Sequence, residues 1–265
     1  MKAMKPALVT GASRGVGKGV AIAIASSGYK VFATGRTIRN TTLPETITRI
    51  PCDHTRDDEA SAAFKKIAAE SDQLEILVNN AWGGYERMVE NGQFTWSAPF
   101  WDQPAHRWTS MMDAGVRAAF TCSANAVRMM IPRRRGLIVN IGFWAAQEYV
   151  GNTIYGIAKA ATDKMSSDTA CELRDNNIAV ISLYPGMVRT EAVLAAAEQG
   201  WLDLSNSESP EFIGHVIAAL ASDPNLMEKS GKVLIAAAEA IGYEVTDSGK
   251  QPRPLTLDDI TTVRL

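Results

Sequence analysis

The chain has 265 residues, of which 46% are hydrophobic and 21% charged, and its formal net charge is −2. This composition is typical of a globular protein with a sizeable core, and it excludes a disordered or fibrous chain. The near-neutral charge provides no attraction for nucleic acid or an anionic membrane, and no apolar run approaches the roughly 20 residues of a membrane span. We therefore expect neither a nucleic-acid partner nor a membrane span.

The first residues, MKAMKPALVT, run from two lysines directly into an apolar segment and leave no room for the apolar region of a signal peptide. Cys52, Cys122 and Cys171 show neither a metal-binding spacing nor an even disulfide framework. This pattern predicts buried thiols in a reducing compartment. We therefore expect a cytoplasmic protein without a metal site.

Short apolar segments alternate with longer amphipathic ones along the chain. The predicted strands are almost wholly apolar and lie at residues 7–10, 30–34, 48–52, 74–78, 137–141, 178–183 and 232–236. The predicted helices lie between them, at 16–27, 55–71, 104–131, 153–174 and from 209 onward. Strands that are apolar on both faces must be covered on both sides. The pattern therefore predicts an α/β fold, a single-domain doubly wound parallel sheet of about seven strands with helices on both faces, over residues 1–265.

Residues 81–108 depart from this pattern, because they are rich in aromatic residues and glycine. A long loop after a parallel strand lies at the sheet edge where ligands bind in such folds. The loop forms either an aromatic mini-core or the wall of an apolar substrate pocket, and both can hold together.

A glycine-rich turn, TGASRGVG from Thr10 to Gly17, follows the first predicted strand and opens the first helix. Gly11 permits the tight turn, Gly15 lets the backbone approach a pyrophosphate, and Gly17 allows close helix–strand packing. The helix N-terminus offers free N–H groups and a positive dipole to the phosphates. The motif predicts a dinucleotide site of the Rossmann type.

The end of the second predicted strand indicates which dinucleotide binds. It reads Thr34-Gly35-Arg36, without the nearby acidic residue that would take a ribose 2′-hydroxyl in an NAD site. Arg36 can hold a 2′-phosphate bidentately, and Arg14 in the glycine turn adds a second cation. We therefore expect NADP(H) in preference to NAD(H).

Tyr155 and Lys159 stand four residues apart at the start of a predicted helix, so they share one face. The Lys159 ammonium can stabilise a phenolate, which predicts a pKa for Tyr155 below its usual value of about 10. A tyrosine tuned in this way can act as a general acid.

Five motifs, taken in order, resemble the short-chain dehydrogenase/reductase family along nearly the full chain. They are the turn TGASRGVG, Asp53 after the third predicted strand, Asn79-Asn80-Ala81, the Tyr155–Lys159 pair, and Pro185-Gly186-Met-Val-Arg-Thr190. The segments FWDQPAHRW, GVRAAFTC and GKVL are similar to the branch of dehydrogenase/reductase member one. The resemblance implies that a small molecule is interconverted between carbonyl and alcohol, and an aromatic-walled pocket implies that this molecule is moderately apolar. The resemblance also implies a homodimer or homotetramer that assembles through the two long helices.

The resemblance further implies roles for individual residues. Hydride passes to the carbonyl carbon while Tyr155 protonates the oxygen. Residues that would hold the pyrophosphate and adenosine phosphate are Gly11, Ser13, Arg14, Gly15, Val16 and Gly17. Asp53 would meet the adenine amino group, and Lys159 the nicotinamide ribose. Asn80 and Ala81 would contact the adenosine ribose. The nicotinamide ring would be held by Pro185, Gly186, Val188 and Thr190.

Phe143, Trp144 and Trp201 are candidate walls of the substrate pocket. Trp201 lies in a second loop, residues 187–208, where the family keeps a mobile lid over the substrate. The same stretch could equally be an ordinary surface helix.

Two expected polar residues are missing. The family places a substrate-binding serine 12 or 13 residues before the tyrosine, but Phe143 and Gly142 stand there. Gly115 replaces an expected asparagine, and Asp113 is the nearest polar substitute. Losing one donor to a developing oxyanion costs about 2.7–4 kcal/mol.

Three explanations remain open. Another donor could replace the serine, and the candidates are Trp144, Gln147, Asn152 and Thr153. The substrate could carry its own polarisation, as a conjugated or charged carbonyl does. Alternatively, the protein is a catalytically weakened NADP-binding regulatory or scaffold protein.

Overall fold

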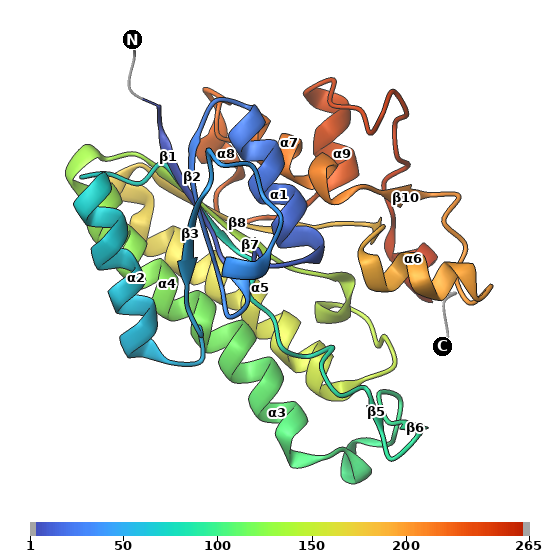
Figure 1. Ribbon diagram of the computed structural model, residues 1–265. Coiled ribbons are helices and arrows are strands. Elements are labelled where there is room, and N and C mark those ends of the chain that lie inside the picture. The colour runs from blue at the N-terminus through green and yellow to red at the C-terminus, as the bar shows by residue number, and fades with distance from the viewer. Residues whose placement is uncertain (1–3, 262–265) are drawn as a thin grey trace.

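Seven parallel strands form the centre of the molecule in a computed structural model that describes residues 4–261 (Figure 1). Their order across the sheet is β11-β8-β7-β4-β1-β2-β3. The strands are β1 (Pro6–Val9), β2 (Lys30–Gly35), β3 (Thr48–Pro51), β4 (Ile76–Asn79), β7 (Gly136–Ile141), β8 (Ile178–Tyr184) and β11 (Val233–Ile235). The order reverses between β1 and β4, which is the point where doubly wound sheets bind ligands. The predicted fold class is confirmed.

Helices cover both faces of this sheet (Figure 1). They are α1 (Gly15–Ser26), α2 (Asp57–Glu70), α3 (Ala105–Met111), α4 (Ala118–Met130), α5 (Thr153–Leu173), α6 (Glu191–Glu198), α7 (Pro210–Leu220), α8 (Leu226–Lys229), α9 (Ala236–Gly242) and α10 (Leu257–Thr261). The predicted helix over 104–131 is interrupted between α3 and α4 by a π-helical turn, Met112–Arg117. Such turns are frequent at functional sites.

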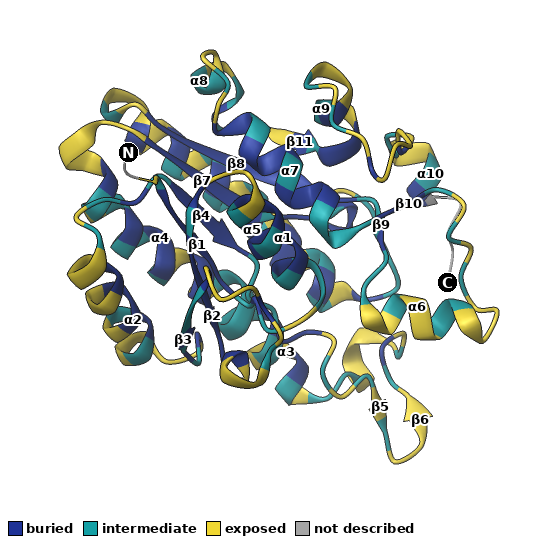
Figure 2. Cartoon of the chain, turned by 45° about the horizontal axis from the view of Figure 1, so that its top comes forward, coloured by how far each residue is buried: buried dark blue, intermediate teal, exposed yellow. Residues whose placement is uncertain are grey.

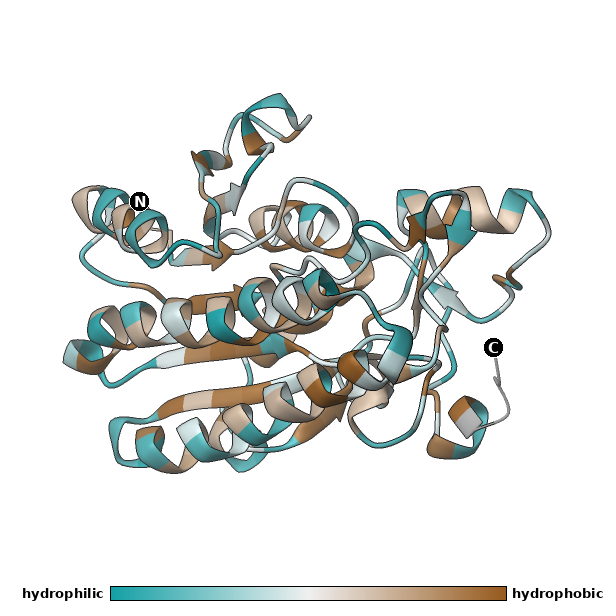
Figure 3. Ribbon diagram, turned by 90° about the horizontal axis from the view of Figure 1, so that it is seen from below, coloured by the Kyte–Doolittle hydropathy of each residue, from teal (hydrophilic) through white to brown (hydrophobic). Residues whose placement is uncertain are grey.

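The alternation of side chains along the strands produces two separate cores. Leu8 of β1 packs with Phe64 and Ile67 under α2, α4 and α5. Its neighbours Ala7 and Val9 point to the other face and pack under α1 and α7. Figure 2 shows the resulting buried central layer, and Figure 3 shows that the strands carry much of the hydrophobic sequence.

The two predicted loops both contain short strands beyond the main sheet. β5 (Val89–Glu90) and β6 (Gln93–Phe94) form an antiparallel hairpin in the first loop. β9 (Met187–Val188) pairs in parallel with β10 (Ser207–Glu208) at the ends of the second. Both loops project from the same end of the molecule in Figure 1, the end at which the parallel strands finish.

The prediction of buried thiols is correct for Cys52 and Cys122 and wrong for Cys171, which is exposed. Cys171 lies on the outer side of α5, because Ala170 and Leu173 occupy the face that packs on the sheet. Over residues 4–261, no helix combines the length and apolar character needed to cross a membrane. Within the same range, the His, Cys, Asp and Glu side chains form no group able to hold a metal ion.

Candidate active site

The glycine turn lies tightly against the end of β4. Gly11 has φ +65°, and a Cβ there would lie 2.7 Å from the Cα of Ala81. A Cβ at Gly17 would lie 2.3 Å from the side-chain nitrogen of Asn80. That nitrogen donates to the carbonyl oxygens of Thr10 and Gly11, at 3.1 Å each. Asn80 and Ala81 therefore hold the turn in place, and only glycine fits at its two closest approaches.

The first turn of α1 already binds a carboxylate. The N–H of Gly15 donates to Oε2 of Glu191 at 2.9 Å, an arrangement that the positive end of a helix favours. Ser13 Oγ is buried and has no hydrogen-bond partner within residues 4–261. These free or anion-occupied donors fit the phosphates of a dinucleotide. Glu191 was not predicted, since nothing in its local sequence indicates a position 176 residues away in the chain.

Arg14 and Arg36 converge, and a third residue joins them. Arg14 Nη2 lies 3.4 Å from Glu86 Oε1, and Arg36 forms a close ion pair with the same oxygen. Glu86 comes from the aromatic loop, so it could not be found among the neighbours of Arg36 in the sequence. A carboxylate therefore stands between the two cations that we expect to hold a 2′-phosphate.

Asp53 follows β3 and accepts hydrogen bonds from the Thr55 backbone N–H at 3.0 Å and from its hydroxyl at 2.8 Å. Partial burial opposes ionisation, but these bonds prevail and hold the pKa of Asp53 below its ordinary value. Asp53 therefore carries a negative charge at neutral pH at the edge of the site.

Helix α5 positions Tyr155 and Lys159. Asn152 caps the helix by accepting from the backbone N–H of Tyr155 at 3.0 Å. The tyrosine and lysine are buried, and Lys159 Nζ donates to the Ile141 carbonyl at 2.8 Å. Burial lowers the pKa of Lys159 to about 8, although Asp163, one turn further along, opposes the shift. Lys159 is therefore charged at neutral pH but close to its titration point.

The predicted lowering of the Tyr155 pKa is wrong. Burial raises that pKa well above the ordinary value, and the neighbouring Tyr85 raises it further. The Lys159 ammonium lies 5.8 Å from the Tyr155 ring centre and is engaged by the Ile141 carbonyl, so it does not offset the desolvation. Tyr155 consequently holds its proton firmly at neutral pH.

An enclosure of aromatic rings surrounds Tyr155. The ring centres of Trp96, Trp82, Tyr85 and Phe143 lie 5.3, 5.6, 6.0 and 6.0 Å from that of Tyr155. The hydroxyls of Tyr85 and Tyr155 lie within hydrogen-bond distance, 3.0 Å apart. Trp82, Tyr85 and Trp96 of the aromatic loop thus pack around Tyr155, and Phe143, from the segment after β7, adds a fourth ring.

The other two pocket candidates lie elsewhere. Trp144 packs its ring against Tyr184, with centres 5.4 Å apart, in a separate cluster. Trp201 follows α6 and is 73% exposed. The structure does not bring either ring into the enclosure around Tyr155.

Among the candidate replacement donors, Asn152 and Gln147 are engaged by other partners, whereas Trp144 Nε1 is buried and has no hydrogen-bond partner within residues 4–261. The amide nitrogen of Asn152 donates to the Trp96 carbonyl oxygen at 2.7 Å, and its amide oxygen accepts from the backbone N–H of Tyr155 in α5. Gln147 donates to the Tyr184 hydroxyl at 3.4 Å. Thr153 is exposed at the start of α5.

The two positions that lack a polar side chain are also short of space. A Cβ at Gly142 would lie 2.3 Å from Ser182 Oγ. A Cβ at Gly115, in the π-helical turn, would lie 2.6 Å from the Trp82 ring. A serine or asparagine at these positions would therefore collide with its neighbours.

The segment after β8 lies against the glycine turn. A Cβ at Gly15 would lie 3.4 Å from Thr190 Cγ2. Thr190 caps α6, and the N–H of Gly186 donates to the buried Glu208 at 2.9 Å. Pro185 and Val188 are buried beside them. This places the predicted nicotinamide segment next to the predicted phosphate turn.

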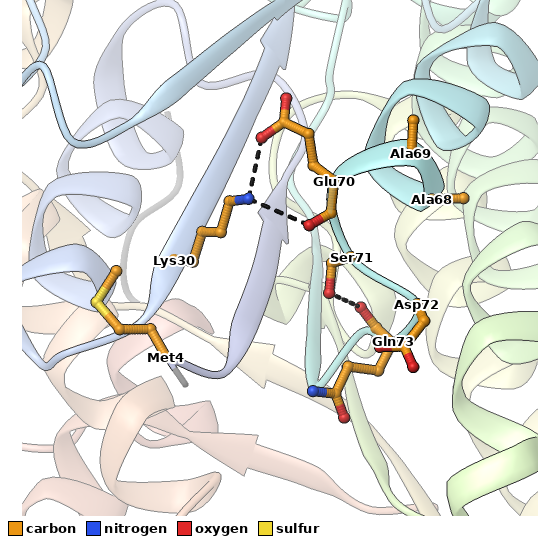
Figure 4. A pocket seen from close by; sticks show the side chains of 8 residues that line it. All are labelled: Met4, Lys30, Ala68, Ala69, Glu70, Ser71, Asp72 and Gln73. Atoms are coloured by element: carbon orange, nitrogen blue, oxygen red, sulfur yellow. Dashed lines mark hydrogen bonds and ion pairs between the residues drawn. The ribbon is translucent and has the colours of Figure 1, made fainter. Parts of the chain in front are cut away.

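The hollow shown in Figure 4 lies away from this site. It is lined by Met4, Lys30 and residues 68–73, where β2 begins and α2 ends. An ion pair of 3.0 Å joins Lys30 to Glu70 across it. It belongs to the amino end of the sheet, whereas Tyr155 and the glycine turn lie at the carboxyl end.

A Rossmann-type sheet with a glycine turn, a Tyr–Lys pair on one helix and a proline–glycine segment after β8 defines a dinucleotide-binding oxidoreductase. Residues 5–200 match the family model described as short chain dehydrogenase, and the chain belongs to the short-chain dehydrogenase/reductase family. It is 35% identical to Dehydrogenase/reductase SDR family member 1 of Mus musculus, over 92% of this chain and 83% of that protein. The expected similarity to this branch is confirmed.

Solved structures share the fold. A short chain dehydrogenase/reductase family protein is 27% identical with a TM-score of 0.70, and the match covers 89% of this chain and 97% of that one. The structure titled ElxO with NADP bound is 23% identical with a TM-score of 0.74, over 88% and 97% of the two chains.

Proposed function

We propose that the protein is an NADP(H)-dependent oxidoreductase that interconverts a carbonyl and an alcohol on a moderately apolar small molecule. The observation that carries this proposal is the Tyr155 hydroxyl, which is buried in an aromatic enclosure one helical turn from the charged Lys159. The glycine turn with Arg14, and Arg36 after β2, lie at the same edge of the sheet. An apolar enclosure with a few polar groups is typical of a small-molecule site.

The cofactor, when bound, supplies or accepts the hydride. The phosphates would be held by the glycine turn and the first turn of α1, with Arg14 and Arg36 on the 2′-phosphate. Lys159 would bind the nicotinamide ribose, and the segment from Pro185 to Thr190 the nicotinamide. The aromatic rings exclude water and orient an apolar substrate.

In the reductive direction, Tyr155 is the proton donor. The carbonyl carbon gains the hydride, the π electrons of the C=O bond move to oxygen, and that oxygen takes the Tyr155 proton. The raised pKa keeps this proton in place until negative charge develops on the substrate. Binding to the nicotinamide ribose would draw the Lys159 ammonium from the Ile141 carbonyl, and its positive charge would then stabilise the phenolate left behind.

The test measures NADPH oxidation with a panel of an aromatic aldehyde, an aromatic 1,2-diketone and an aliphatic ketone. We expect Tyr155→Phe to lower turnover by about 10²–10⁴-fold, the range of a general acid, while NADPH fluorescence shows unchanged binding. Tyr149→Phe is the matched control, because Tyr149 is 66% exposed just before α5.

Full turnover by Tyr155→Phe would contradict the proposal. NADPH binding without turnover of any carbonyl would favour the regulatory or scaffold alternative, which the missing serine and asparagine support.

A homodimer or homotetramer that assembles through α4 and α5 stays a prediction, and sedimentation of the purified protein tests it.

A further inference from the structure

The hydroxyl of Tyr85 faces the hydroxyl of Tyr155 at 3.0 Å. We propose that Tyr85 supplies the second hydroxyl of the active site and donates a hydrogen bond to the carbonyl oxygen of the substrate beside Tyr155. Tyr85 would thus take the role that the family gives to a serine. This inference rests on the proposed function.

The place expected for that serine cannot supply a donor. Gly142 has no room for a side chain, because its Cβ would collide with Ser182 Oγ at 2.3 Å. Phe143 presents a ring to Tyr155, with centres 6.0 Å apart, and carries no polar atom. A donor to the substrate oxygen must therefore reach the site from another element.

The aromatic loop fixes Tyr85 in position. Its ring packs against Trp96 and Trp82, with centres 5.5 and 6.0 Å away. A Cβ at Gly84 would lie 2.5 Å from the Trp82 ring, so the turn that carries Tyr85 depends on glycine before it. The packing of its ring and the tight turn before it thus fix the phenol.

The exposure of Tyr85 differs from that of its partner. Tyr155 is 4% exposed, whereas Tyr85 is 53% exposed and forms part of the loop surface. Desolvation around its hydroxyl nevertheless raises the pKa of Tyr85, so the group is a neutral donor at neutral pH. A substrate that enters beside this ring meets the two hydroxyls together.

The chemistry needs no further reagent. A carbonyl oxygen has two lone pairs and can accept a hydrogen bond from each phenol, in place of the bond that the phenols share. When hydride adds to the carbon, the oxygen takes the proton of Tyr155, while Tyr85 keeps its own proton and its hydrogen bond. A fixed donor at an oxygen that gains negative charge stabilises the transition state more than the ground state.

Tyr85→Phe tests this role, because it keeps the ring and its packing and removes one hydroxyl. We expect kcat with the aromatic 1,2-diketone to fall about 100- to 1000-fold, as it does when one oxyanion donor is lost. The KM for NADPH and the Tm should not change, and Tyr149→Phe should behave as the native protein. An unchanged or increased kcat would overturn the proposal; an increase would mean that Tyr85 blocks the substrate position.

A second measurement needs neither cofactor nor substrate. Tyr85→Phe removes the hydroxyl that lies 3.0 Å from the Tyr155 hydroxyl, so it should shift the pKa of Tyr155 in the free protein. The pKa is measured from the tyrosinate absorbance as the pH is raised. The titration of Tyr85→Phe minus that of the double variant Tyr85→Phe/Tyr155→Phe gives the signal of Tyr155 without Tyr85. The titration of Tyr149→Phe minus that of Tyr149→Phe/Tyr155→Phe gives the reference signal of Tyr155 with Tyr85 present. An unshifted pKa would contradict the contact.

The two proposals fail in different ways. If Tyr155→Phe is inactive and Tyr85→Phe is fully active, the role of Tyr85 is wrong and the proposed function stands. If both variants turn over at the native rate, the proposed function itself is wrong.

Discussion

The indole of Trp82 fills the space into which a side chain at position 115 would project, since a Cβ on Gly115 would lie 2.6 Å from its ring. The same ring lies 4.6 Å below the Lys159 ammonium and edge-on to Tyr155. The missing asparagine and the aromatic enclosure are thus two aspects of one packing arrangement.

Gly115→Asn should therefore destabilise the protein by about 1–3 kcal/mol, the usual cost of overpacking, as measured by urea unfolding. In a Trp82→Ala background the same substitution should cost less, because the ring no longer occupies the space. Gly242→Asn is the control, as a Cβ there meets nothing within 4 Å and its φ is not positive. Strictly additive effects of the two substitutions would contradict the direct contact.

The carboxylate of Glu86 stands between Arg14 and Arg36, so an incoming 2′-phosphate has to displace it. We expect Glu86→Gln to tighten NADPH binding roughly fivefold, about 1 kcal/mol for an exposed ion pair, and to leave NADH binding no tighter. Fluorescence titration with both cofactors measures the ratio. The control is Glu90→Gln in the same loop, where Glu90 pairs with Arg87.

Arg36→Ala should have the opposite effect and weaken NADPH binding by about 10- to 100-fold, the loss of charge-assisted hydrogen bonds. Equal losses of affinity for NADPH and NADH would show that Arg36 does not bind the 2′-phosphate.

The charge of Lys159 should give activity an alkaline limit. Because its pKa is lowered to about 8, the ammonium is present below that pH and is lost as the pH rises through it. We expect kcat/KM for carbonyl reduction to fall above about pH 8. Asp163→Asn removes a charge that raises this pKa, so the limit should move to lower pH. Asp168→Asn, on the exposed side of α5 and paired with Lys164, should leave it in place. A shift to higher pH in Asp163→Asn would contradict this assignment.

Local sequence patterns were sufficient to predict the framework. Most strands could be recognised because they are almost wholly apolar, β3 being the exception with Thr48 and Arg49. The Tyr155–Lys159 pair could be recognised because a helix places residues four apart on one face. The glycine turn also lies within eight consecutive residues. Features that depend on neighbouring residues in the chain were therefore predicted.

The residues that complete the site come from distant segments. Tyr85 meets Tyr155 across 70 residues, and Glu86 meets Arg36 across 50. A loop without periodicity does not reveal which of its side chains turn inward. The pKa of Tyr155 was predicted in the wrong direction for the same reason, since the burial of its hydroxyl depends on how that loop packs.

The bond between Glu191 and Gly15 has a consequence for the order of events. A pyrophosphate seated at the start of α1 requires the N–H that Glu191 now occupies. Arrival of a dinucleotide there would break this hydrogen bond between the first turns of α1 and α6. We expect the segment that carries Trp201 to be held less firmly once the dinucleotide is bound, which would favour binding of the dinucleotide before the carbonyl compound.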